Sequence, residues 1–278
     1  MKMSGQGEPN TTRSPGWFDR LRHQGAIHQI IRYVVSIILL LACWEIASLI
    51  ITAVKGRALL PDPYHAMSEV VRLAPILFRH FWVSAWRLVL AMLLAFSTGY
   101  PLGLLIGHER KLDEIISPII YIVYPIPQVA FILLLFLVFG IGNPVKVAIV
   151  AVALFFQILV SARGAAKLID QEHLTSVLSV GASRWQVYRH VVLPATLPSI
   201  LTSLRVSVGL GMAFLYIAET TATMAPGLGS FVKSSQFNQA QAFAGILMMA
   251  FLGLILYIMI DVLERVLCRW KYVRGRGS

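Results

Sequence analysis

The sequence predicts an all-α, polytopic membrane protein, and three observations support this fold class. Hydrophobic residues fill 57% of the 278 positions and charged residues only 13%, whereas soluble domains carry about 25% charged residues. The mean hydropathy is +0.73, which excludes a disordered chain. The apolar residues gather in six long runs, and the two cysteines are too few for a disulfide scaffold.

Each of the six runs is long enough to cross about 30 Å of hydrocarbon, which takes roughly 20 helical residues. The runs are continuous, as in Ile37–Leu41, rather than alternating as in the strands of a membrane barrel. The sequence therefore predicts six transmembrane helices, at residues 33–54, 82–107, 114–139, 144–162, 196–218 and 242–264.

The distribution of cations predicts the orientation of these helices. A net charge of +11 alone would suggest a nucleic-acid surface, but in a membrane protein Lys and Arg gather on the cytoplasmic side. With a cytoplasmic N-terminus, sixteen of the 24 Lys and Arg lie inside, and two lie within spans. Both termini and the polar segment 163–195 are thus expected in the cytoplasm. Six cations are expected outside: Lys55, Arg57, Arg72, Arg79, Lys146 and Lys233.

The chain divides into a tail, one membrane domain and a short basic end. Residues 1–28 are rich in Gly, Ser, Pro, Thr and Asn and predict a mobile tail. The membrane domain is expected at 29–272, and the basic tail at 273–278. The first apolar run is too long for a signal peptide. A turn at Leu60–Pro63 and a short outer helix after it are expected between the first two spans.

Two stripes of small residues predict close helix contacts, because helices associate in lipid where small side chains let backbones approach. The stripes face protein in either of two interpretations, packing within the bundle or contact between two copies of the chain. Small residues recur every fourth position at Ala91, Ala95, Gly99, Gly103 and Gly107, and again at Ser199, Ser203, Ser207 and Gly211.

Prolines interrupt the third predicted span near mid-membrane. Pro118, Pro125 and Pro127 each remove a backbone donor, and Tyr124 and Gln128 flank the last two. Freed backbone at membrane depth is tolerated where it is buried in protein or lines a wet cavity. The break either lines a passage through the membrane or is a kink for packing.

Charged residues within spans are costly and mark functional candidates. Glu45, Arg87, Arg205 and Glu219 lie in such positions. Arg87 and Glu219 fall at similar depth toward the outer ends of their spans, so we expect them to pair. The pair either orients the helices or gates a passage.

Arg205 lies nearer the middle of its span than the other arginine. Its guanidinium would attract an anion in a passage, or would instead reach the inner interface or bond to carbonyl groups. Gln157 and Tyr216 complete the set of residues expected to line a passage, with the residues of the proline break.

The polar segment 163–195 predicts two short helices that meet at a tight corner. Leu174, Val177 and Leu178 give the first helix an apolar face, and Gly181 suits the positive φ of a helix end. Ser183 predicts the N-cap of the second helix, with Gln186 as its capping-box partner. Pro194 and Pro198 end this helix or open the next span. An exposed apolar and basic corner of this kind is a docking element.

The same segment resembles the coupling-helix signature of ABC importer permeases, written E-A-A, three residues, G, nine residues, I-x-L-P. Gly181 and Val191–Pro194 keep the spacing, whereas Thr175-Ser176-Val177 replaces the E-A-A triplet. The run Gly181–Val187 is most similar to the nitrate/sulfonate/taurine/bicarbonate branch of the binding-protein-dependent permeases. The likeness covers roughly residues 33–272.

The resemblance implies a bacterial inner-membrane importer built from two permease copies, two cytoplasmic ATPases and an external solute-binding protein. ATP and Mg would bind the partner ATPase and not this chain. The solute would be small, such as a sulfonate, nitrate or carboxylate, although the branch also handles heterocyclic solutes. The residues implied in ATPase coupling are Thr175, Ser176, Val177, Gly181, Ala182, Ser183, Arg184, Trp185, Leu193 and Pro194.

Other classes of function fit the sequence less well. It contains no G-x-x-x-x-G-K-[ST] phosphate loop, no H-E-x-x-H motif and no spacing of His and Cys that predicts a metal site. A secondary carrier or channel is the alternative, but it needs carboxylates near the midplane, where Glu45 is the one deep candidate, and often an internal repeat. A membrane enzyme needs a nucleophile and base, which no pattern provides.

Overall fold

A computed structural model shows a helical protein. It describes residues 17–57, 59–169, 179, 181–221 and 225–270, with side chains from residue 31 onward, and this part of the chain contains no strand. It divides into two compact units, one ending at Tyr64 and one beginning at His65.

The first unit is built on one long helix, α1 (Trp17–Lys55). The helix begins within the segment predicted as a tail, because no proline follows Pro15 until Pro61. The loop after α1 folds back on it: the Trp44 indole donates to the Pro61 carbonyl (2.9 Å) and the Ser48 hydroxyl to the Leu60 carbonyl (2.7 Å). Among residues 31–55 of α1, most other side chains are apolar and exposed within this unit, as expected of a surface that faces lipid.

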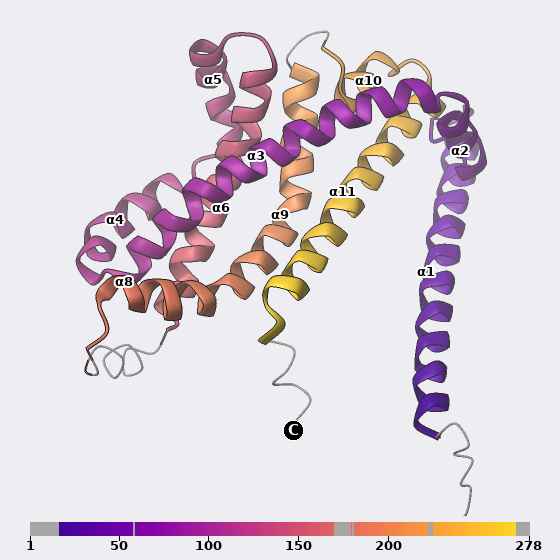
Figure 1. The fold of residues 1–278 in the computed structure, drawn as a ribbon. Helices are drawn as coiled ribbons and strands as arrows, with labels where there is room; N and C mark the ends of the chain where they lie inside the picture. Colours follow the sequence, from indigo (N-terminus) through magenta and orange to yellow (C-terminus); the bar gives the residue numbers. More distant parts are fainter. Residues whose placement is uncertain (1–16, 58, 170–178, 180, 222–224, 271–278) are drawn as a thin grey trace, which may run out of the picture. The chain divides into compact units, whose positions relative to one another are not determined.

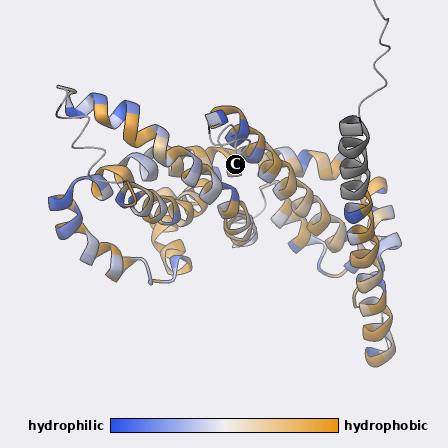
Figure 2. Cartoon of the chain, turned by 90° about the horizontal axis from the view of Figure 1, so that it is seen from below, coloured by the Kyte–Doolittle hydropathy of each residue, from blue (hydrophilic) through white to orange (hydrophobic). Residues whose placement is uncertain are grey.

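The second unit is a bundle of long and short helices (Figure 1). Helix α3 packs along α6, α6 packs on α9, and α9 packs on α11. Figure 2 shows that these long helices are mostly hydrophobic. The helices are α2 (Pro63–Arg72), α3 (Ala74–His108), α4 (Arg110–Val123), η1 (Gln128–Ala130), α5 (Phe131–Phe139), α6 (Asn143–Lys167), α8 (Arg184–Val187), η2 (Tyr188–Val192), α9 (Leu193–Thr221), α10 (Leu228–Ser234) and α11 (Gln239–Leu267).

Five of the predicted spans correspond to single helices that are long and apolar enough to cross a membrane. Each observed helix extends beyond the predicted span, by the largest margin in α1, which begins at Trp17 and not near residue 33. Helix α3 begins at Ala74 and not near residue 82. The short outer helix predicted after the first span is α2.

The remaining predicted span, which is the third in chain order at 114–139, is not a single helix. Its two halves, Arg110–Val123 and Gln128–Phe139, are bent by 78° at the break. Pro125 and Pro127 cannot donate backbone hydrogen bonds, and a short turn closes instead through Ile126 N–H to the Val123 carbonyl (3.0 Å). The predicted break is therefore confirmed, as a change of direction far sharper than a packing kink.

The first small-residue stripe sets the closest contact in the bundle. An added Cβ at Gly103 would lie 2.5 Å from the Leu159 carbonyl oxygen and 2.6 Å from the Ala162 Cβ, both on α6. The residues of this stripe are buried except Gly107, which is half-buried. The stripe faces protein, as predicted, and it lets α3 and α6 pack backbone against backbone.

The second stripe packs against two helices over most of its length. The Ser203 hydroxyl donates to Ser161 on α6 (2.8 Å), Ser207 is buried, and Gly211 packs against Leu88 and Leu154. Ser199, at the start of the stripe, is exposed. Packing within one chain therefore accounts for three of its four residues.

Replacing Gly103 with Ala should destabilise the bundle, because the new Cβ forces α3 away from α6. We expect a loss of about 1–3 kcal/mol in unfolding free energy, as for other overpacked cores. Thermal unfolding of the detergent-solubilised protein measures it.

Gly164→Ala is the matched control, because no atom lies within 4 Å of its added Cβ. It should leave the protein unchanged or stabilise it by about 0.5–1 kcal/mol through helix propensity. Equal effects of the two substitutions would contradict the close approach of α3 and α6.

Candidate functional site

A buried ion pair joins α3 to α9. Arg87 Nη1 donates to Glu219 Oε1 at 2.7 Å, and both side chains are at most 1% exposed. Ser84, one turn before Arg87, donates its hydroxyl to both Glu219 oxygens (2.8 and 2.9 Å). Asn143, at the start of α6, accepts from Arg87 Nε and Nη2 (3.1 and 2.5 Å). The predicted pair is confirmed, and a third helix joins it.

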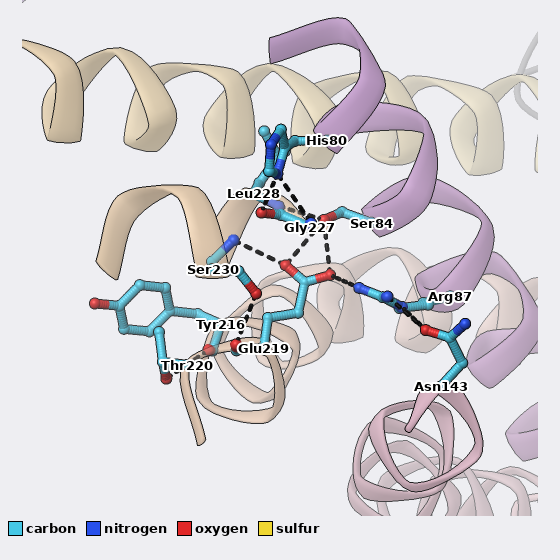
Figure 3. A network of polar contacts seen from close by, with 11 residues as sticks. His80, Ser84, Arg87, Asn143, Tyr216, Glu219, Thr220, Gly227, Leu228 and Ser230 are labelled. Carbon is cyan, nitrogen blue, oxygen red and sulfur yellow. Dashed lines mark hydrogen bonds and ion pairs between the residues drawn. The ribbon is translucent and has the colours of Figure 1, made fainter. Parts of the chain in front are cut away.

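The first turn of α10 is bonded to the same carboxylate and to Ser84 (Figure 3). The Gly229 N–H donates to Glu219 Oε2 (2.8 Å), and the Leu228 N–H donates to the Ser84 hydroxyl (2.8 Å). A Cβ on Gly227 would fall 2.7 Å from Arg87 Nη1. The close approach of the chain at Gly227 thus depends on glycine. Both carboxylate oxygens of Glu219 accept hydrogen bonds in this network.

Lys146 lies in the first turn of α6, near this network. It was expected on the outer surface, but its side chain is fully buried and its Nζ has no hydrogen-bond partner among the described residues. Helix α3 packs along α6 and reaches its first residue through Arg87 and Asn143, so the aliphatic stem of Lys146 joins the core. The buried group therefore contains two basic side chains, Arg87 and Lys146, and one carboxylate.

A second ion cluster lies about 21 Å along α9 from Glu219, taking 1.5 Å per residue. Arg205 pairs with Asp261 and Glu264 on α11 and lies over the Tyr257 ring at 5.6 Å. Arg265 pairs with the other oxygen of Asp261 (2.8 Å). Arg205 therefore bonds to side-chain carboxylates, which neither sequence interpretation anticipated, and its charge is already balanced.

The break in the third span meets α6 through polar side chains. The Tyr124 hydroxyl donates to Gln157 Oε1 at 3.2 Å. Pro125 and Pro127 are exposed beside Tyr124, and Gln128 is half-buried. These five predicted passage residues form one group. Arg205 and Tyr216 lie elsewhere on α9; Tyr216 is 39% exposed, with its ring pointing away from Glu219 (Figure 3).

The corner of the polar segment keeps the predicted backbone. Gly181 has a φ of +90°, which favours glycine. Ser183 accepts from the Gln186 N–H (3.3 Å), and Gln186 Oε1 accepts from the Ser183 N–H (2.8 Å), which completes the capping box. The first predicted helix of the hairpin, with Thr175, Ser176 and Val177, lies outside the described residues.

The second helix of the hairpin presents one face outward. Trp185 is 66% exposed and stacks on Tyr188 with ring centroids 5.9 Å apart, and Arg184 is also exposed. Val187 and Val192 are buried in the core. The corner thus has an exposed aromatic and basic surface, and its helix is anchored in the core through Val187 and Val192.

The helix then passes through the π-turn η2 directly into α9. Pro194 lies in the first turn of α9, so it opens the next span rather than ending the hairpin helix. The Tyr100 hydroxyl of α3 donates to the Leu193 carbonyl (3.2 Å). Leu193 and Pro194 are half-buried and therefore anchor the corner rather than belong to its outward surface.

Sequence reasoning missed the acidic partners of three cations. Asp261 and Glu264 lie three residues apart in the last predicted span, which was a usable signal for a partner to Arg205. Arg163 and Lys167 were expected in a cytoplasmic loop, but α6 continues through both, and both donate to Asp113 on α4. The carboxylate of Asp113 just precedes the predicted third span.

The chain has clear relatives. Residues 99–267 match the family described as "Binding-protein-dependent transport system inner membrane component". The taurine transport system permease protein TauC of Escherichia coli (strain K12) is 32% identical over 242 residues, 84% of this chain and 86% of that protein. The putative aliphatic sulfonates transport permease protein SsuC of Bacillus subtilis (strain 168) is 28% identical over 238 residues, 84% of each. A solved structure of the MetNI methionine ABC transporter aligns with a TM-score of 0.61 at 20% identity, over 70% of this chain and 98% of that chain.

In the part of the chain that the structure describes, five spanning helices and a broken sixth form the type I ABC importer permease fold. The chain belongs to the family of binding-protein-dependent transport system inner membrane components. It is the transmembrane permease subunit of an ABC importer, and nothing favours a secondary carrier or channel. Importers of this family work with an ATPase and a solute-binding protein as separate partners.

Substituting Glu219 with Gln should destabilise the protein, because it leaves Arg87 buried without a counter-charge. Breaking a buried pair by removing one partner costs about 3–5 kcal/mol. Thermal unfolding in detergent measures this loss.

Glu114→Gln serves as the control, because Glu114 pairs with Arg110 on the surface, where both side chains are more than half exposed. It should change stability by less than about 1 kcal/mol.

Exchanging Arg87 and Glu219 should not restore stability, because a guanidinium cannot accept from Ser84 and Gly229. Full rescue by the exchange would mean that the pair acts through charge alone.

Proposed function

We propose that this permease moves a small organic sulfonate or a similar anion across the bacterial inner membrane. The 32% identity to a taurine permease over 84% of the chain carries the proposal. The aliphatic sulfonate permease is a second relative of similar coverage. An external binding protein would select the solute, since Arg205 is already paired with carboxylates.

The passage would run beside the proline break. Tyr124, Gln128 and Gln157 offer neutral hydrogen-bonding groups there, and exposed Pro125 and Pro127 leave carbonyls that a passing solute or water can reach. Tyr216 would meet the solute nearer the Glu219 end of α9. Neutral hydrogen-bonding groups suit a passage in which the solute must bind weakly and then be released.

The corner from Gly181 to Trp185 would dock on a cytoplasmic ATPase, with Thr175–Val177, Leu193 and Pro194 completing the segment. Exposed Arg184 and Trp185 supply the aromatic and basic contacts that anchor protein interfaces. ATP and Mg would bind the ATPase dimer, and this chain would pair with a second copy of itself. Both termini would lie in the cytoplasm, as the charge distribution predicts.

Gly181→Val tests the docking corner. A β-branched residue at a φ of +90° is strained, so we expect ATP-driven uptake to be lost. No atom of the described residues lies within 4 Å of an added Cβ, so the strain is confined to the backbone of the corner and the packing of the bundle is undisturbed. Gly181→Asn should keep more uptake, because Asn adopts positive φ more readily. Equal uptake by the Val and Asn variants would contradict a role for this corner's conformation.

A ligand screen tests the solute. The importer is purified through a tag on this chain, and the binding protein that associates with it is screened by thermal shift with taurine, longer alkanesulfonates, nitrate and an uncharged pyrimidine. We expect the sulfonates to stabilise the binding protein, and the reconstituted complex to import the same solute with ATP. A binding protein that responds to the pyrimidine alone would overturn the sulfonate proposal.

A further inference from the structure

A polar cluster ties α4 to the last turns of α6. Asp113 accepts from Arg163 Nε (2.5 Å), from Lys167 Nζ (2.7 Å) and from the Ser117 hydroxyl (2.8 Å). Arg163 Nη2 also donates to Ser117 (2.5 Å), and its guanidinium lies 5.4 Å from the centre of the Tyr121 ring. One carboxylate thus holds two cations from the neighbouring helix.

This cluster is adjacent to the polar segment at both of its ends. Arg163 and Lys167 lie in the last turns of α6, at the start of the polar segment 163–195. Arg184 of the docking corner lies 3.9 Å from Glu109, the residue between α3 and α4. A movement of the segment therefore acts on the start of α4 through both contacts.

The cluster also reaches the proline break. Asp113, Ser117, Tyr121 and Tyr124 are spaced by three or four residues, so they share one face of α4. The last of them, Tyr124, donates to Gln157 on α6. The row extends about 16 Å, from the polar segment to the 78° bend.

A purely structural role would not explain why the contact between α4 and α6 contains the polar residues Asp113, Ser117 and Arg163. Arg163 is only 7% exposed, and well-packed hydrophobic residues often match or exceed the stability of a buried ion pair. Apolar contacts already join the same helices through Ile120 of α4 and Leu159 of α6, with Ile106 of α3 in the same cluster. The polar cluster therefore adds a directional link to a contact that packing alone would hold.

We infer that the contact of Asp113 with Arg163 and Ser117 transmits ATPase-driven movement of the polar segment to the proline break, with Asp113 as a positioning residue. The inference rests on the proposed docking role of the corner at Gly181–Trp185. Lys167, which is about half exposed, keeps hold of Asp113 through small shifts of α6, because a flexible ammonium follows its partner. The bend between α4 and α5 would be the element whose arrangement this link biases.

The test uses the complete importer, with its ATPase and binding protein, in proteoliposomes that report uptake and ATP hydrolysis together. Asp113→Asn keeps the side-chain volume and removes the charge. We expect uptake to fall about tenfold while hydrolysis stays near the wild-type rate, so that the solute carried per ATP falls by the same factor. Asp113→Glu should recover most of this ratio. Arg110→Gln, on the exposed side of the same turn, should leave the ratio unchanged.

Proportional loss of uptake and hydrolysis in Asp113→Asn, or an unchanged ratio, would overturn the inference. If that variant does not assemble, Ser117→Ala decides, because it keeps the ion pair and removes one bridging hydroxyl. A lowered ratio in Ser117→Ala supports transmission, and a wild-type ratio overturns it. A wild-type complex without ATP-driven uptake would instead count against the proposed function.

Discussion

Charge inside hydrocarbon must be neutralised within the protein, and the arrangement of this bundle depends on that requirement. Each buried or half-buried arginine of the described spans has a carboxylate on a neighbouring helix: Glu219 for Arg87, Asp113 for Arg163, and Asp261 with Glu264 for Arg205. These pairs join α3 to α9, α4 to α6, and α9 to α11. Because an unpaired partner would be costly, each pair fixes the axial position of its two helices.

The bundle combines one rigid contact with weaker ones. Glycines bring α3 against α6 at backbone distance, where no side chain can adjust. Helix α4, by contrast, meets α6 through a small apolar cluster and polar side chains that can exchange partners. The α3–α6 contact thus provides the fixed frame, and the broken span beside it has the freedom that a transport cycle needs.

Local features were predictable from the sequence, whereas contacts between distant residues were mostly not. The spans, the capping box at Ser183 and the positive φ at Gly181 follow from periodicity and backbone chemistry, which act over a few residues. The pair of Arg87 and Glu219 was predictable because both lie at similar depth in spans. Asp113 was missed because it just precedes a predicted span, and the buried position of Lys146 depends on how α3 covers α6.

Neutralisation also bears on how a permease of this kind treats its solute. Arg205 shares two carboxylates, so an anion that approaches it gains little net attraction and would have to displace a bound partner. A free guanidinium there would hold an anion tightly and slow its release. A balanced cluster and the neutral groups at Tyr124 and Gln157 would leave the proposed passage without a strong preference for one solute. Discrimination between solutes would then lie with the proposed external binding protein.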